Sequence, residues 1–271
     1  MISNQLMFKE IRSTIGKLFS GKSQDVISIF ISKFYWFFRK YFLGIEIKKN
    51  NKFKQNWKKI IKFSAMDEER CFSLYQLLKI HNEIFKNKKK TSSNLVLERG
   101  LLFILYSICN FLNNRANVYG LDTFGDFVND MNNHLITKHD DHFQGYNPFT
   151  SKYFSKFDYQ EFERKVNSEF KNKKIKLKLI KCLFPTNFKK NGLAKINKFK
   201  FSFVLIDFNL YKPTLSAIKF ILPKLEKNAI ILFDDYNNIN SKGVKRAVKK
   251  SDLNLDKCFE TSTGQLVYIN N

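Results

Sequence analysis

Acidic residues directly follow four short apolar runs of this sequence. Glu98 and Asp122 end the first two runs, Asp207 ends a later one, and Asp234 with Asp235 follows the last. If the runs are parallel strands of an open α/β sheet, the acids lie at its carboxyl edge, which is where such sheets bind ligands. Carboxylates at this edge can accept hydrogen bonds from ribose hydroxyls, or bind a divalent cation that prefers oxygen ligands.

Asp207, Asp234 and Asp235 form the candidate metal site. Adjacent carboxylates at the end of an apolar strand repel one another unless a cation or hydrogen-bond donors offset the repulsion. Three acids on neighbouring strand ends therefore favour a hard divalent cation. Alternatively, Asp234 caps a turn and Asp207 caps the following helix. The residue types alone leave both interpretations open, and for Glu98 or Asp122 taken singly a surface or helix-capping acid is the commoner explanation.

A second segment, His139-Asp140-Asp141-His142, also has the residue types of a metal site. It lies in a polar stretch without helical or strand periodicity. We therefore expect a solvent-exposed loop there rather than a chelating cluster.

Strand signals alternate with helical signals over most of the chain. Helical periodicity begins after Asp67 and ends at the polar run 86–93. The alternation that follows is typical of a doubly wound, mostly parallel sheet, and the last two strands indicate a terminal hairpin. The predicted strands are 94–98, 116–121, 175–181, 201–207, 229–233, 257–261 and 265–270, and the predicted helices among them are 101–113, 158–170, 213–225 and 243–250.

Length and composition favour one α/β domain with an extension. The chain has 271 residues, more than one typical domain but short of two. A hydrophobic content of 44% with 16% aromatic residues excludes an intrinsically disordered chain. The 4 cysteines lack any C-x-x-C spacing, which excludes a disulfide scaffold or zinc ribbon and favours a reducing compartment. The first residues lack the pattern of a secretory signal, so we expect a cytoplasmic protein.

The net charge of +24 raises nucleic acid and anionic membranes as partners. However, Lys, Asn, Ile and Phe are abundant together, as expected of a chain translated from AT-rich codons, and the lysines are spread over the whole length. The sequence has no basic and aromatic module of the RNA-binding kind. We therefore interpret the charge as compositional, which argues against a nucleic-acid partner.

Residues 1–62 form a predicted basic, aromatic, helical extension, and residues 63–271 form the predicted catalytic domain. Within the extension, residues 26–45 are strongly aromatic, but Lys and Arg interrupt them before the roughly 20 apolar residues that a transmembrane helix needs. Such a segment suits a helix in a membrane interface, here at the inner face of the membrane, or a helix packed on the domain or on a second copy of the chain. Residues 48–62, rich in Lys and Asn, are predicted to be a connector.

Five segments of the chain carry a family resemblance. They are ERCFSLY at 69–75, LVLERG at 95–100, YGLDTF at 119–124, FVLIDFNLYKPTLSAIKFILPKLEKNAIILFDDYNN at 203–238, and GVKRAV at 243–248. Together, and in this order, they resemble the macrocin O-methyltransferase family. The shared features are a Glu-Arg-x-x-x-Leu-Tyr helix, an Asp-Thr-Phe segment, an Asp-x-Asp-x-Tyr-x-x-Thr segment and a strand that leads into Asp-Asp-Tyr.

The resemblance implies a fold and a reaction. The fold would be α/β and Rossmann-like, of the class I methyltransferase kind, with a mostly parallel seven-stranded sheet ending in an antiparallel hairpin. The reaction would be O-methylation of a sugar hydroxyl in a glycan precursor or small glycosylated metabolite, with S-adenosylmethionine and Mg²⁺ or another divalent cation as cofactors. The implied cofactor-binding residues are Glu98, Gly100 and Asp122, the implied metal ligands are Asp207, Asp234 and Asp235, and the implied catalytic residues are Asp207 and Asp235.

Departures from the family pattern leave a second interpretation open; one of them is Lys181-Cys182-Leu183, where the family tends to have Gly and an acid. The glycine-rich loop after the family's first strand is replaced by bulky residues from Leu101 to Leu105, which could block the cofactor pocket. Asn209 stands at the second acid of Asp-x-Asp and cannot take up a proton as an ionised carboxylate can. The alternative is a catalytically degenerate methyltransferase fold that acts as a binding or scaffolding partner.

Overall fold

The computed structural model describes residues 43–61, 66–85, 92–97, 116–122, 136–143, 160, 164, 168, 175–181 and 196–271. Those from Ile47 onward belong to one unit. The aromatic segment up to residue 42, Glu98, Gly100 and the predicted helix 101–113 lie outside the described residues. In the described ranges, no helix is both long and apolar enough to cross a membrane.

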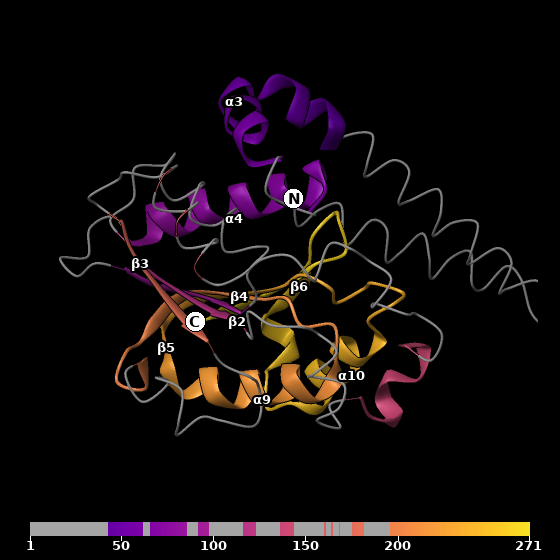
Figure 1. The fold of residues 1–271 in the computed structure, drawn as a ribbon. Coiled ribbons are helices and arrows are strands. Elements are labelled where there is room, and N and C mark those ends of the chain that lie inside the picture. The colour runs from indigo at the N-terminus through magenta and orange to yellow at the C-terminus, as the bar shows by residue number, and fades with distance from the viewer. Residues whose placement is uncertain are drawn as a thin grey trace, which may run out of the picture. The chain divides into compact units, whose positions relative to one another are not determined.

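Seven strands form one sheet in the order β3-β2-β1-β4-β5-β7-β6 (Figure 1). The pairs among β1 to β5 are parallel, and β7 is antiparallel to both β5 and β6. This arrangement confirms the predicted fold class. The strands are β1 (Ser92–Leu97), β2 (Ala116–Asp122), β3 (Ile175–Lys181), β4 (Phe201–Ile206), β5 (Leu225–Phe233), β6 (Cys258–Glu260) and β7 (Leu266–Asn270).

Helices cover both faces of the sheet. Figure 1 shows α4 (Glu68–Phe85) on one face, with α9 (Tyr211–Ile221) and α10 (Lys242–Lys250) on the other. Every residue of the central strand β4 is buried, as expected of a strand covered on both sides. Phe203 meets the ring of His81 of α4 edge-on, whereas Val204 joins the core cluster that contains Ile218 of α9. Short 3₁₀ turns complete the described elements: η2 (Lys138–Phe143), η4 (Leu222–Lys224) and η5 (Leu255–Lys257).

The predicted connector at 48–62 is wrong, because most of it forms the helix α3 (Asn51–Ile60). The side chain of Asn50 caps this helix by accepting a hydrogen bond from the N–H of Phe53 at 2.9 Å. Phe53 is fully buried, with its ring 4.9 Å from that of Phe72 and 5.4 Å from that of Tyr75. The lysines that suggested a connector lie between buried residues such as Phe53. The segment is an amphipathic helix, which its overall composition does not reveal.

The predicted helix 213–225 ends earlier than expected, because Leu225 begins β5. Pro223 lies in η4, directly after α9, and lacks the N–H that a continuing helix would use. Asn228 has a φ of 65°, in the left-handed region that Asn tolerates better than most residues. The register between β4 and β5 shifts nearby, between Phe201 and Phe203. β5 therefore starts four residues before the predicted 229, as an irregular extension.

Candidate functional site

The sheet register brings the predicted strand-end acids to one edge. One row of paired residues crosses four parallel strands: Leu121, Leu97, Ile206 and Phe233. The residues that follow three of them are Asp122, Asp207 and Asp234. The N–H of Asp234 still donates to the carbonyl of Ile206 at 3.0 Å, so the strands remain aligned beyond this row. The acids therefore share the carboxyl edge, as the sequence predicts.

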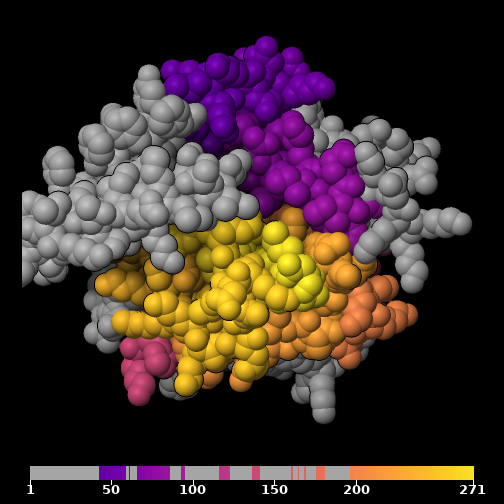
Figure 2. Space-filling view, turned by 180° about the vertical axis from the view of Figure 1, so that it is seen from behind, coloured from indigo at the N-terminus to yellow at the C-terminus, as the bar shows by residue number. Residues whose placement is uncertain are grey.

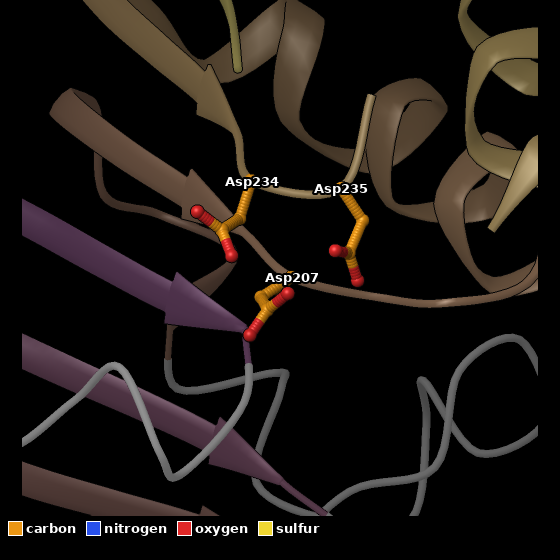
Figure 3. A group of neighbouring side chains, drawn as sticks. All are labelled: Asp207, Asp234 and Asp235. Atoms are coloured by element: carbon orange, nitrogen blue, oxygen red, sulfur yellow. The ribbon is translucent and has the colours of Figure 1, made fainter. Parts of the chain in front are cut away.

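Asp207, Asp234 and Asp235 converge there. One carboxylate oxygen from each residue lies within 4.8 Å of the other two, and Figure 3 shows the three side chains gathered around the ends of the strands. Asp234 and Asp235 are 4% and 6% exposed, and Asp207 is half-buried. Buried carboxylates this close require positive charge or hydrogen-bond donors to offset their repulsion.

Arg70, in the first turn of α4, supplies positive charge. Its Nη1 donates to Oδ2 of Asp234 at 2.7 Å and lies 3.6 Å from Oδ1 of Asp235. Asp67 fixes the arginine from the other side, because its Oδ2 accepts from Nε at 3.1 Å and its Oδ1 accepts from the backbone N–H of Arg70 at 2.8 Å. Asp67 is thus both the cap of α4 and a clamp on the guanidinium.

Gln265, at the β6–β7 hairpin, holds the other oxygen of Asp234. Its Nε2 donates to Oδ1 of Asp234, while its own Oε1 accepts from Thr263 at 3.0 Å. The hydroxyl of Thr263 also lies 3.3 Å from that of Ser73, on α4. This chain of hydrogen bonds fixes the orientation of the Gln265 amide and so aims a donor at Asp234.

Opposing effects act on the ionisation of these groups. Burial is the largest effect on Asp234 and raises its pKa to about 6; the charge of Asp235 also raises it, while Arg70 and Gln265 lower it. For Arg70, burial lowers the pKa, but the carboxylates of Asp234 and Asp235 outweigh burial and leave the pKa above its usual value. The guanidinium therefore keeps its charge.

Asp235 has described partners on one of its two oxygens. Its Oδ1 accepts from Nδ2 of Asn238 at 2.8 Å and faces Arg70. Among the residues that the structure describes, no donor is recorded on Oδ2 of Asp235.

The donor set fits a hard divalent cation. All three candidate ligands are carboxylates, which Mg²⁺ and Ca²⁺ prefer. The three carboxylates outnumber the single guanidinium, which Asp67 also pairs, so the cluster keeps a net negative charge that a divalent cation would offset. Asp207, Asp234 and Asp235 would hold it, with Arg70 and Gln265 orienting Asp234 from behind.

The other residues predicted for the site have different outcomes. Asp122 ends β2 at the same edge and is half-buried. Glu98, Gly100 and residues 101–105 lie outside the described residues, so their part in the cofactor site stays a prediction from the sequence. Asn209 accepts a hydrogen bond at its Oδ1 from the hydroxyl of Ser241 at 3.0 Å. Its amide nitrogen is therefore the group it can offer to a ligand.

Asp140 is not in the solvent-exposed loop that the sequence predicts. It is fully buried, its Oδ2 accepts from the N–H and hydroxyl of Thr137, and its Oδ1 accepts from the N–H of Tyr211 at 2.9 Å. The last bond caps α9, whose own N-cap residue, Leu210, has no side chain that can accept. The three hydrogen bonds give the carboxylate of Asp140 a structural role. Figure 2 shows 136–143 against the C-terminal part of the chain, where the carbonyl of His139 accepts from Arg246.

Sequence reasoning missed Arg70, Gln265 and Asn238 as members of the site. Arg70 lies in the motif at 69–75 that carries the family resemblance, which was a usable signal. Asn238 also lies in such a segment, 203–238, and is only three residues from Asp235. Gln265 follows a turn of ordinary polar composition, and only the fold brings it to Asp234.

Solved structures similar to this chain include two methyltransferases. The O-methyltransferase NovP is 14% identical, with the alignment covering 77% of this chain and 82% of NovP at a TM-score of 0.51. The calicheamicin methyltransferase CalS11 is also 14% identical, with 80% and 91% covered at a TM-score of 0.50. No protein-family model and no curated protein matches the sequence. The chain has the class I methyltransferase fold. Identities this low show the fold alone.

Proposed function

We propose that the protein is an S-adenosylmethionine-dependent, divalent-metal-assisted O-methyltransferase of the macrocin kind, acting on a sugar hydroxyl of a glycan or glycosylated metabolite. One observation carries the proposal: Asp207, Asp234 and Asp235 converge at the carboxyl edge of a sheet with the strand order of this fold. The similarity to NovP and CalS11, both methyltransferases, supports the reaction class. The sugar acceptor follows from the resemblance of segments 203–238 and 243–248.

The carboxylates have separate tasks in this proposal. Asp207, Asp234 and Asp235 would hold a divalent cation, which would lower the pKa of a hydroxyl bound to it and orient that hydroxyl. Methyl transfer forms a bond from the acceptor oxygen to the methyl carbon, breaks the bond from that carbon to the sulfonium sulfur, and releases one proton. Asp207, and Asp235 through Oδ2, are the carboxylates placed to take up that proton. Asp234, with a donor on each oxygen, keeps the geometry fixed.

The cofactor would lie toward β1 and β2. Asp122 ends β2 and can accept hydrogen bonds from ribose hydroxyls, the task that acids at this edge perform in dinucleotide-binding sheets. Glu98 and Gly100 complete the proposed cofactor site. β1 lies between β2 and β4 in the sheet, so the cofactor and the acids would sit at adjacent parts of one edge.

Titration calorimetry of S-adenosylmethionine into the full chain, with and without Mg²⁺, tests the proposal. We expect binding in both conditions, and Mg²⁺-dependent methylation when sugars are screened as acceptors. The double variant D207N/D235N is the control: it should still bind the cofactor but lose the transfer. Absence of cofactor binding in both conditions would overturn the proposal in favour of a scaffolding protein.

A further inference from the structure

Arg70 faces the whole acid cluster with one end of its guanidinium. Nη1 lies 2.7 Å from Oδ2 of Asp234 and 3.6 Å from Oδ1 of Asp235, and the charge of Asp207 also acts on it. The opposite edge of the guanidinium is held by Asp67 through Nε. The arginine thus has a fixed direction, with its charge directed toward the proposed cation ligands.

The charge of Arg70 is also poorly screened. Its side chain is only 25% exposed, and those of Asp234 and Asp235 are 2% and 7% exposed. Arginine stays protonated at every pH at which a protein is folded. The cluster therefore contains one permanent positive charge in a largely buried setting, where interactions between charges are much stronger than in water.

We infer that Arg70 is a positioning residue that lowers the net negative charge of the acid cluster and thereby weakens the preference of the site for trivalent over divalent cations. The inference rests on the cation site proposed above and gives Arg70 a task there. The guanidinium repels any bound cation, and the repulsion grows with the charge of that cation. It therefore penalises a trivalent ion more than a divalent one, while the excess of carboxylates still attracts both ions.

The effect of the Arg70 charge on cation binding constants is large enough to measure. A unit charge about 5 Å from an ion, at an effective dielectric constant of about 20, changes a binding constant by more than about tenfold per unit of ion charge. If a substitution distorts the arrangement of the ligands, the affinities for two ions of similar size fall by similar factors. Protons that compete for the carboxylates also lower the two affinities by similar factors. The ratio of two affinities therefore isolates the electrostatic contribution of Arg70.

The test compares Ca²⁺ with Tb³⁺, which are similar in size. Tb³⁺ binding to the full chain is followed by its luminescence, with Tyr236, a buried neighbour of Asp235, as the sensitiser, and Ca²⁺ binding is followed by displacement of Tb³⁺. R70Q removes the charge but keeps a donor, whereas R70K keeps the charge. K79Q is the matched control, because Lys79 is an exposed cation about 13 Å further along the same helix.

We expect R70Q to shift the preference toward Tb³⁺ by about tenfold or more, with R70K and K79Q staying within about threefold of the wild type. Weaker binding of both ions by R70Q at an unchanged ratio would show a merely structural arginine and would overturn the inference. If the wild-type chain binds neither ion, the proposed cation site is wrong, which is a separate failure.

Folding of the variant does not limit the test. If R70Q unfolds without a cation, it is prepared in Ca²⁺ and the exchange with Tb³⁺ is measured directly, because the bound ion would replace the missing positive charge. Failure of R70Q to fold even in Ca²⁺, while R70K folds, would show that a cation cannot substitute for Arg70 and would also overturn the inference.

Discussion

Asp234 is held from two directions by residues far apart in the chain. Arg70 donates to one oxygen and Gln265 to the other, and the carboxyl group is almost completely buried. Burial disfavours the ionised form more strongly than these two donors favour it, so the pKa is raised to about 6. The protonation of Asp234 therefore depends on its burial and on its contacts with Arg70 and Gln265.

We expect the pH dependence of stability to reveal this proton. The pKa of Asp234 rises from an ordinary value of 3.8 to about 6 on folding, so the folded state binds the proton more tightly than the unfolded state. Its contribution to the free energy of unfolding is complete below about pH 4 and is lost as the pH rises to about 6. Urea unfolding of cation-free wild type and D234N over pH 4 to 7 should show this difference in slope. Parallel profiles would contradict it.

Elements outside the parallel strands complete the acid cluster. The N-terminal turn of α4 supplies Arg70, and the β6–β7 hairpin supplies Gln265, with Ser73 and Thr263 joining the two by a hydrogen bond. Residues behind metal ligands commonly change metal affinity by about 10- to 100-fold, because they orient the ligands. The hairpin is therefore part of the proposed site as well as the end of the sheet.

The variant Q265M should weaken cation binding by about 10- to 100-fold. Methionine preserves the length of the side chain but removes the donor to Oδ1 of Asp234. Calorimetric titration with Mg²⁺ or Mn²⁺ measures the change. Q76M, a similar substitution at a half-buried position of α4, is the control and should bind as the wild type does. Equal affinities of Q265M and wild type would refute a role for the hairpin.

The junction of η2, α9 and α10 is a second place where elements meet closely. A Cβ added to Gly243 would lie 2.8 Å from the backbone nitrogen of Tyr211 and closer still to Oδ1 of Asp140. Glycine is therefore required at the start of α10 for the buried cap of α9 to form. Asp207 and Asn209 lie just before α9, so this junction also supports the loop that carries them.

G243A should lower the free energy of unfolding by about 1 to 3 kcal/mol, because its methyl group overlaps the capping bond of Asp140. Denaturant unfolding measures the change. The control is G44A, since a Cβ at Gly44 meets nothing within 4 Å and this helical position gains from alanine. If G243A lowers the free energy of unfolding no more than G44A does, the junction accommodates the added methyl group and the prediction is wrong.

At the scale of the whole molecule, we propose that residues 26–45 bind an anionic membrane surface. The deletion that tests this should end at residue 46, because α3 belongs to the unit that starts at Ile47 and its Phe53 packs on Phe72. We expect the full chain, but not the chain lacking residues 1–46, to float with vesicles that contain anionic lipid. A full chain that stays with the unbound fraction would discard the proposal.

Sequence periodicity predicted the sheet well and the polar segments poorly. Buried parallel strands are short apolar runs, so β2, β3 and β4 were located to within a residue or two. Composition misled at α3, where a few buried anchors such as Phe53 outweigh many lysines, and at Asp140, which looked solvent-exposed. In both places contacts distant in the sequence contribute, those of Phe53 with Phe72 and Tyr75 and that of Asp140 with Tyr211, and no local pattern encodes such contacts.

The order of the strands along the chain, the terminal hairpin and the identity of the strand-end acids can all be predicted from the residues, because they depend on local periodicity and on which residue ends each run. The groups that lie next to those acids become known only from the folded chain. Arg70 and Gln265 are 195 residues apart, yet both bind Asp234. Their charge and hydrogen bonds act through distance in space, which sequence spacing does not specify.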